Sequence, residues 1–138
     1  MDVAVLAGGR SPEHDVSLAS TAQVLQHLDR ARWRVWPVYL DRAGAWWPRK
    51  TPLPAGEIWN PGDRAQAVGA MRPGAAVDWL QSHAKVAVVL PVLHGPFGED
   101  GTVQGMLALH DLKFQMDQEG RRDVESQAAA VLQNLRRA

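Results

Sequence analysis

Two segments of this sequence share one order of features: an apolar run, a glycine-rich turn and a helix signal. Residues 3–7 are apolar and end at Gly8 and Gly9, which is typical of a buried strand that stops at a tight turn. Residues 86–90 are a β-branched run followed by a loop rich in glycine and acid, the pattern of a strand covered on both faces. Strands that alternate with helices predict an α/β fold with an open, mainly parallel sheet flanked by helices.

The segment after Gly9 predicts a helix. Ser11 suits the N-cap and Pro12 the first helical position, because the fixed φ of proline fits there and its missing N–H costs nothing. The helix is expected to end near Arg30. Its buried face is predicted from apolar residues at steps of four, three and three, which are Leu18, Ala22, Leu25 and Leu28.

Residues 34–40 predict a second strand, rich in Val, Trp and Tyr, although Pro37 is unfavourable inside a strand. The turn at 41–44 and the short run after it predict a hairpin. Residues 48–73 hold most of the prolines and are expected to be loop, with at most a weak helix around 63–70.

Beyond the run at 86–90, Pro91 is expected to end the strand or to make it irregular. Residues 1–114 hold the alternating strands and helices and predict one domain. Residues 115–122 are polar, and residues 123–137 have the periodicity of an amphipathic helix with arginines in its last turn. We therefore expect 115–138 to be a polar linker and a C-terminal helix outside that domain.

The composition excludes several classes of function. Fifteen Lys and Arg balance fifteen Asp and Glu, so neither nucleic acid nor a membrane surface is expected as a partner. The absence of cysteine removes disulfides, thiolate catalysis and Cys-ligated metals. No apolar run approaches the ~20 residues that a membrane helix needs, and no leader is evident. A cytoplasmic protein is expected.

Both glycine-rich loops are expected beyond the carboxyl ends of the strands, where open parallel sheets bind ligands. In the first loop, free amides at the helix start suit an anion, whereas the carboxylate of Glu13 suits an ammonium group. A zwitterion such as an amino acid would satisfy both. The alternative for Glu13 is a carboxylate that interacts with the helix dipole. His14 and Asp15 are interpreted as solvated residues of the helix start, and Ser17 as a local hydrogen-bonding residue rather than a nucleophile.

The second loop begins with His94, which could orient a ligand or donate a hydrogen bond near neutral pH; the alternative is a loop histidine bonded to the backbone. Glu99 and Asp100 are interpreted as helix caps rather than a metal pair, so no metal site is predicted. Neither G-x-G-x-x-G nor G-x-x-x-x-G-K-[ST] occurs. A dinucleotide-binding protein is therefore a poorly supported alternative, and no cofactor-binding residue is predicted.

Taken together, the two loops resemble the two signature motifs of the amino-terminal domain of D-alanine–D-alanine ligases. The matching stretches are AGGRSPEHDVSL at 7–18 and LHGPFGEDGTVQG at 93–105, and residues 38–47 are similar to the family's second strand and hairpin. The resemblance implies a Rossmann-like pre-ATP-grasp domain of a ligase of peptidoglycan synthesis, which joins two D-alanines at the expense of Mg-ATP. By motif match it implies that Glu13 is catalytic and holds the ammonium group of the first D-alanine, with His94 beside that subsite and Ser17 supporting the Glu13 loop.

The sequence after residue 114 departs from that family. The family continues there into an ATP-grasp domain that binds ATP and magnesium and stabilises the acyl phosphate, and this chain has no such sites. We therefore expect a truncated or split ligase that is inactive alone and binds D-alanine weakly. Its expected partner is either a second copy of the chain, in a homodimer, or a separate ATP-grasp chain. The alternative is a non-catalytic binding or assembly module that kept the fold.

Overall fold

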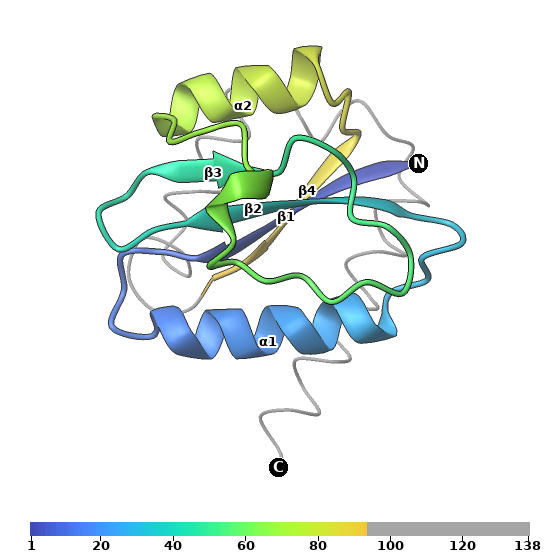
Figure 1. The fold of residues 1–138 in the computed structure, drawn as a ribbon, viewed down its shortest axis with the longest axis horizontal. Helices are drawn as coiled ribbons and strands as arrows, with labels where there is room; N and C mark the ends of the chain where they lie inside the picture. The colour runs from blue at the N-terminus through green and yellow to red at the C-terminus, as the bar shows by residue number, and fades with distance from the viewer. Residues whose placement is uncertain (94–138) are drawn as a thin grey trace.

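The computed structural model describes residues 1–93. Within them, four strands form one sheet in the order β3-β2-β1-β4. The strands are β1 (Asp2–Gly8), β2 (Arg34–Leu40), β3 (Trp46–Pro48) and β4 (Val88–Val92), and the helices are α1 (His14–His27), α2 (Pro73–Ser82) and the short 3-10 helix η1 (Arg64–Gln66). β1 runs parallel to both β2 and β4, and β3 runs antiparallel to β2. The predicted α/β fold with an open, mainly parallel sheet flanked by helices is confirmed (Figure 1).

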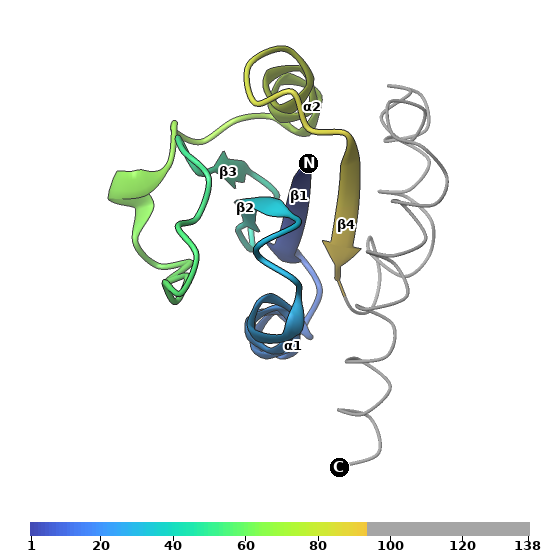
Figure 2. The same cartoon turned by 90° about the vertical axis from the view of Figure 1, so that its right-hand side faces the viewer.

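Helices α1 and α2 cover opposite faces of the sheet, as Figure 2 shows. Val3 and Val5 of β1 belong to the core cluster that contains residues of α1, whereas Ala4 and Leu6 belong to the cluster that contains residues of α2. Successive side chains of a strand point to opposite faces of its sheet. The uninterrupted apolar run of β1 is therefore explained by a helical layer on each side.

The buried face of α1 differs from the predicted one. Leu25 and Leu28 are buried as expected, but Ala22 is exposed and Leu18 is only partly buried. Most of the side chains of this helix that are buried are polar: His14, Ser17, Ser20 and Thr21, with Val24 and Leu25 as the apolar members. A polar side chain is tolerated in a core when hydrogen bonds within the protein replace its hydrogen bonds to water. The spacing of apolar residues in the sequence does not show whether such partners are present.

Helix α1 also begins later than predicted, at His14, and ends at His27 rather than near Arg30. Ser11 nevertheless fulfils much of its expected role, because its hydroxyl accepts a hydrogen bond from the Glu13 amide at 3.0 Å and its carbonyl accepts one from the His14 amide at 3.1 Å. The turn at 11–13 therefore leads into the helix with its amides satisfied.

Strand β2 has the predicted bounds and includes Pro37. Strand β3 ends at Pro48, and the next residue, Arg49, donates its amide to the Pro37 carbonyl at 3.0 Å. Proline is tolerated there because this bond uses its carbonyl and needs no N–H from position 37. The hairpin between β2 and β3 is confirmed. Strand β4 begins at Val88 and continues through Pro91 to Val92, so the predicted end at Pro91 is wrong. Among the described strands β4 stands at the end of the sheet order, where a missing N–H can be spared.

Helix α2 was not predicted from the sequence. Its signal was nevertheless present: Pro73 occupies the first turn, and Ala76, Val77 and Leu80 share one buried face. The predicted weak helix around 63–70 is reduced to the single turn of η1. No helix within residues 1–93 is long and apolar enough to cross a bilayer.

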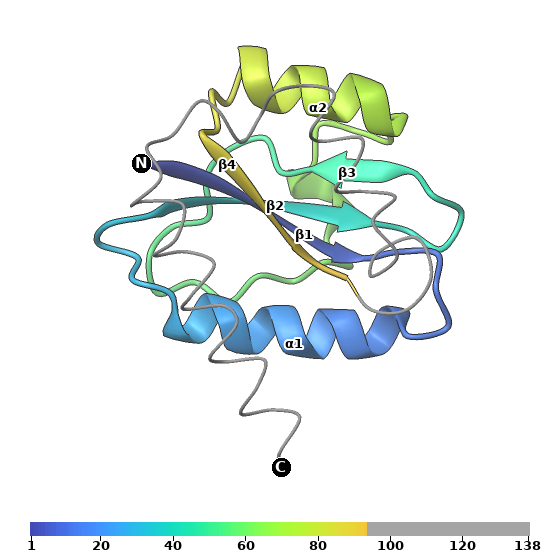
Figure 3. The ribbon, with the colours of Figure 1, turned by 180° about the vertical axis from the view of Figure 1, so that it is seen from behind.

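The strand order creates a switch point between β1 and β4. The chain leaves β1 toward β2 on one side, and it later returns to place β4 on the other side of β1. The carboxyl ends of β1 and β4 lie at the same edge of the sheet, as Figure 3 shows from behind. In open α/β sheets the crevice beyond such neighbouring ends is the usual place for a ligand.

Candidate functional site

Gly8 and Gly9 form the turn that leaves β1 at this edge. Both have positive φ, +99° and +102°, a region that favours glycine. A Cβ atom on Gly8 would lie 2.3 Å from the carbonyl oxygen of Leu40. The close approach is used, because the Gly9 amide donates to that same oxygen at 2.8 Å. Only glycine at position 8 allows β1 and β2 to end this closely together.

Four amides in and after this turn already donate hydrogen bonds within the protein. The Gly8 N–H donates to the Ser17 hydroxyl at 2.9 Å and the Gly9 N–H to Leu40. The Glu13 and His14 N–H groups donate to Ser11. The expectation that free amides at this helix start suit an anion is therefore wrong for these four groups. A bound zwitterion would have to take its anionic contact from groups other than these four.

Ser17 joins three elements at the switch point. Its side chain is completely buried in α1. The hydroxyl accepts from the Gly8 amide at the end of β1 and donates to the carbonyl of Val92 at the end of β4. Ser17 is a hydrogen-bonding residue as interpreted, but the bonds are not local as expected, because Gly8 and Val92 lie 9 and 75 residues away in the sequence. Its own amide donates to the carbonyl of Glu13 at 3.0 Å, so it lies one helical turn from that residue.

His14 is buried, with only 2% of the residue exposed, and the interpretation of it as a solvated residue is wrong. Its Nδ1 lies 2.6 Å from the carbonyl oxygen of Gly9, and its Nε2 lies 3.0 Å from the hydroxyl of Tyr39. The two rings meet edge to face with centroids 5.4 Å apart. Asp15, by contrast, is exposed as expected and accepts a hydrogen bond from Arg42 at 3.1 Å.

Glu13 immediately precedes this buried histidine and is itself exposed. Its carboxylate has no hydrogen bond or ion pair within residues 1–93, so all of its acceptor positions are open on that part of the molecule. His94, Glu99 and Asp100 lie outside the described residues. The predicted approach of His94 to Glu13 therefore remains a prediction.

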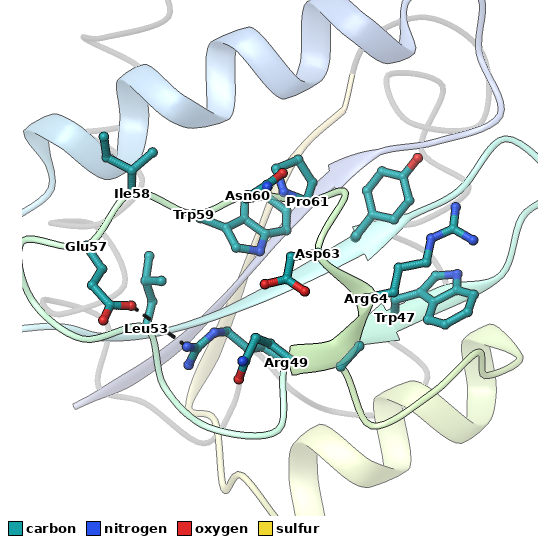
Figure 4. Close-up of a pocket in the computed structure, with 13 residues that line it drawn as sticks. Trp47, Arg49, Leu53, Glu57, Ile58, Trp59, Asn60, Pro61, Asp63 and Arg64 are labelled. Atoms are coloured by element: carbon teal, nitrogen blue, oxygen red, sulfur yellow. Dashed lines mark ion pairs between the residues drawn. The ribbon is translucent and has the colours of Figure 1, made fainter.

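A cavity of about 370 Å³ lies beside β2 and β3 under the segment 49–67, for which no function was predicted (Figure 4). Two arginines that line the cavity already interact with other residues of the protein. Arg49 donates through Nη1 to the carbonyls of Thr51 and Pro52 at 2.8 and 2.7 Å. The guanidinium of Arg64 lies 4.6 Å from the centre of the Trp47 ring. These arginines hold the cavity walls together.

Tyr39 connects this cavity with the turn after β1. Its ring lines the cavity and lies 5.7 Å from the guanidinium of Arg64, while its hydroxyl reaches His14. The family-like stretch 38–47 includes Tyr39 but gave it no role, because its pairing with His14 depends on the parallel register of β1 and β2.

ATP and magnesium do not fit the described residues. Within residues 1–93 no three histidine or acidic side chains gather where they could hold a metal ion. The amides of the glycine turn, Gly8 and Gly9, are bonded to Ser17 and Leu40 and are not free for phosphate oxygens.

Comparison with known proteins identifies relatives over most of the chain. A family described as "D-ala D-ala ligase N-terminus" matches residues 2–115. The D-alanine–D-alanine ligase A of Bradyrhizobium diazoefficiens is 42% identical over 122 residues, covering 81% of this chain and 33% of the relative. The D-alanine–D-alanine ligase of Natranaerobius thermophilus is 42% identical over 118 residues, covering 81% and 32%. The chain thus spans about a third of the length of these curated relatives.

Solved structures agree in fold. The D-alanine–D-alanine ligase from Coxiella burnetii superposes with a TM-score of 0.56 at 24% identity, over 79% of this chain and 33% of its own. The VanG D-Ala:D-Ser ligase from Enterococcus faecalis gives a TM-score of 0.54 at 24% identity, over 78% and 33%. At this identity the likeness shows the fold alone.

Proposed function

Because the chain belongs to the D-alanine–D-alanine ligase N-terminus family, we propose that it supplies the D-alanine side of a ligase reaction. In this proposal Glu13 is the catalytic residue, and its carboxylate binds the ammonium group of the first D-alanine. His94 lies beside that subsite, and Ser17 supports the turn that carries Glu13. The reaction belongs to cytoplasmic peptidoglycan synthesis.

The observation that carries the proposal is the state of Glu13. It stands on a turn at the switch point between β1 and β4, exposed and without a partner among residues 1–93. An ammonium group offers only hydrogen-bond donors and a positive charge, and a carboxylate with open acceptor positions is its natural partner. The amides of Gly8, Gly9, Glu13 and His14 donate hydrogen bonds within the protein, so these four groups offer no free N–H to a ligand.

The proposal limits what the 138 residues do alone. In the ligase family that the chain resembles, ATP and magnesium are expected to activate the D-alanine carboxylate. The described residues of this chain do not fit either group. We therefore expect D-alanine binding without formation of a dipeptide, and an affinity of about 1 mM, because a ligand of so few atoms meets only part of its site. A separate ATP-grasp chain is the proposed partner for catalysis, and a second copy of the chain is the other proposed partner, in a homodimer.

A D-alanine titration of the whole chain, followed by NMR through the amides of Gly8 and Gly9, tests this function. Wild-type protein is expected to show saturable shifts, and Glu13→Gln is expected to abolish them because the amide side chain carries no charge. Asp15→Asn is the matched control, since it removes an exposed carboxylate from the same helix start and is expected to keep the shifts.

Two outcomes would contradict the proposal. Unchanged D-alanine binding in Glu13→Gln would remove Glu13 from the site, and a wild-type protein that gives no D-alanine response would favour the non-catalytic module instead. Phosphate release from ATP and D-alanine above the blank would refute the expected inactivity of the chain alone.

A further inference from the structure

The imidazole of His14 is held from two sides by groups that are distant from each other in sequence. Gly9, in the turn after β1, contributes a carbonyl oxygen 2.6 Å from Nδ1. Tyr39, near the end of β2, contributes a hydroxyl 3.0 Å from Nε2. Because a carbonyl oxygen only accepts, Nδ1 carries the proton, and in the neutral ring Nε2 accepts from the phenol. Both ring nitrogens of this buried side chain are thus satisfied.

This arrangement fixes the backbone that carries Glu13. The turn from Gly9 to Glu13 is held at its start by the bond from His14 to the Gly9 carbonyl, and at its end by the bond from the Glu13 amide to Ser11. The Glu13 carboxylate itself has no contact of this kind within residues 1–93. Its position therefore depends on the backbone of the turn.

We propose that His14 and Tyr39 are positioning residues for the ammonium site at Glu13. His14 acts by holding the Gly9 carbonyl, and Tyr39 acts by fixing the orientation of the imidazole ring. The inference rests on the proposed function of Glu13. It adds two residues whose effect on a ligand passes through the backbone rather than through contact with it.

Three variants separate the two hydrogen bonds of the imidazole. His14→Asn places an amide donor near the position of Nδ1, so it keeps a bond to the Gly9 carbonyl. His14→Gln places its amide near Nε2 and loses that bond. Tyr39→Phe removes one oxygen atom and leaves the ring in the cavity wall. His27→Gln is the control, because His27 is an exposed histidine of the same helix whose Nδ1 bonds locally to Gln23 at 2.9 Å.

The D-alanine dissociation constant is measured for each folded variant by the amide titration, beside its midpoint of urea unfolding. Loss of one hydrogen bond corresponds to a factor of about ten, so His14→Gln is expected to weaken binding about tenfold. His14→Asn is expected to restore affinity to within about threefold of wild type, and Tyr39→Phe to weaken it by about threefold. His27→Gln is expected to bind as wild type does.

The outcomes distinguish this inference from the proposed function. If wild type binds D-alanine, and His14→Gln and Tyr39→Phe bind it as tightly as wild type does, the positioning role is overturned while the role of Glu13 stands. A merely structural role would lower the unfolding midpoint of both His14 variants without the rescue by Asn. If wild type gives no D-alanine response, both proposals fail. Should His14→Gln not fold, Tyr39→Phe decides alone, because it removes a single oxygen.

Discussion

The hydroxyl of Ser17 accepts a hydrogen bond from the amide of Gly8 at 2.9 Å. The same hydroxyl donates to the carbonyl of Val92, so a single buried side chain of α1 ties the ends of β1 and β4 together at the switch point. This places Ser17 among the residues that build the candidate site. The hydroxyl hydrogen is already given to a backbone carbonyl, and no general base is bonded to it among the described residues, which explains why it does not resemble an activated nucleophile.

We expect Ser17→Ala to destabilise the protein. The substitution leaves a buried N–H and a buried carbonyl without their partner, and each unsatisfied group costs about 1–3 kcal/mol, so the total loss is about 2–6 kcal/mol. Urea unfolding followed by tryptophan fluorescence measures it. Ser82→Ala is the control, because Ser82 is exposed and its hydroxyl bonds locally to the Asp78 carbonyl; its effect should stay within about 0.5 kcal/mol. Equal effects of the two changes would contradict the role given to Ser17.

Gly8→Ala is expected to cost about 2–4 kcal/mol, because the new Cβ would meet the Leu40 carbonyl oxygen at 2.3 Å in addition to a positive φ of +99°. Gly56→Ala separates the two causes. Gly56 has φ +84°, and a Cβ added there would have no neighbouring atom within 4 Å, so only the backbone cost of about 1–2 kcal/mol remains. If both variants lose the same stability in urea unfolding, the close approach of β1 and β2 at Gly8 is not a constraint.

Asp41 organises the hairpin and gives the protein a pH dependence. Burial raises the pKa of Asp41, but hydrogen bonds from the Trp47 indole and from the amides of Ala45 and Ala43 outweigh it, so the pKa lies below its ordinary value of 3.8. A carboxyl with a lowered pKa in the folded state stabilises the protein fully above its unfolded pKa, and that contribution is lost as the pH falls through the lower folded pKa.

Asp41→Asn is therefore expected to be less stable than wild type at pH 7, and the difference should shrink as the pH falls below about 4. Urea midpoints measured across this range test the sign. Asp63→Asn serves as the control, because Asp63 is exposed and accepts no hydrogen bond within residues 1–93. A stability difference between wild type and Asp41→Asn that stays constant with pH would contradict the assignment.

Arg49→Ala is expected to cost about 1.5–3 kcal/mol, the range for hydrogen bonds to a charged group. Its side chain is only 12% exposed, and one nitrogen donates to Thr51 and Pro52, which holds the segment beside the cavity of Figure 4. Arg42→Ala removes an exposed ion pair with Asp15 and should change stability by no more than about 1 kcal/mol. Thermal or urea unfolding compares them, and a larger loss for Arg42→Ala would reverse this ranking.

The fold was largely predictable because its strongest signals are local. The apolar run of β1 and the bounds of β2 follow from strand periodicity, and the glycines after β1 mark a turn that requires positive φ. Pro91 misled the prediction for β4, since a proline is excluded only where its N–H must join a ladder. Helix α2 was missed although its apolar spacing was present in the sequence.

The sequence by itself determined the parallel α/β sheet, the turn that carries Glu13 and the family to which the chain belongs, because motifs and periodicity are properties of neighbouring residues. Only the tertiary structure decided that His14 and Ser17 are buried. Their partners, Tyr39 on β2 and Val92 on β4, come from other strands. A polar side chain is buried in a core only where such hydrogen-bond partners are present. The sheet register that brings these partners together cannot be predicted from any local sequence pattern.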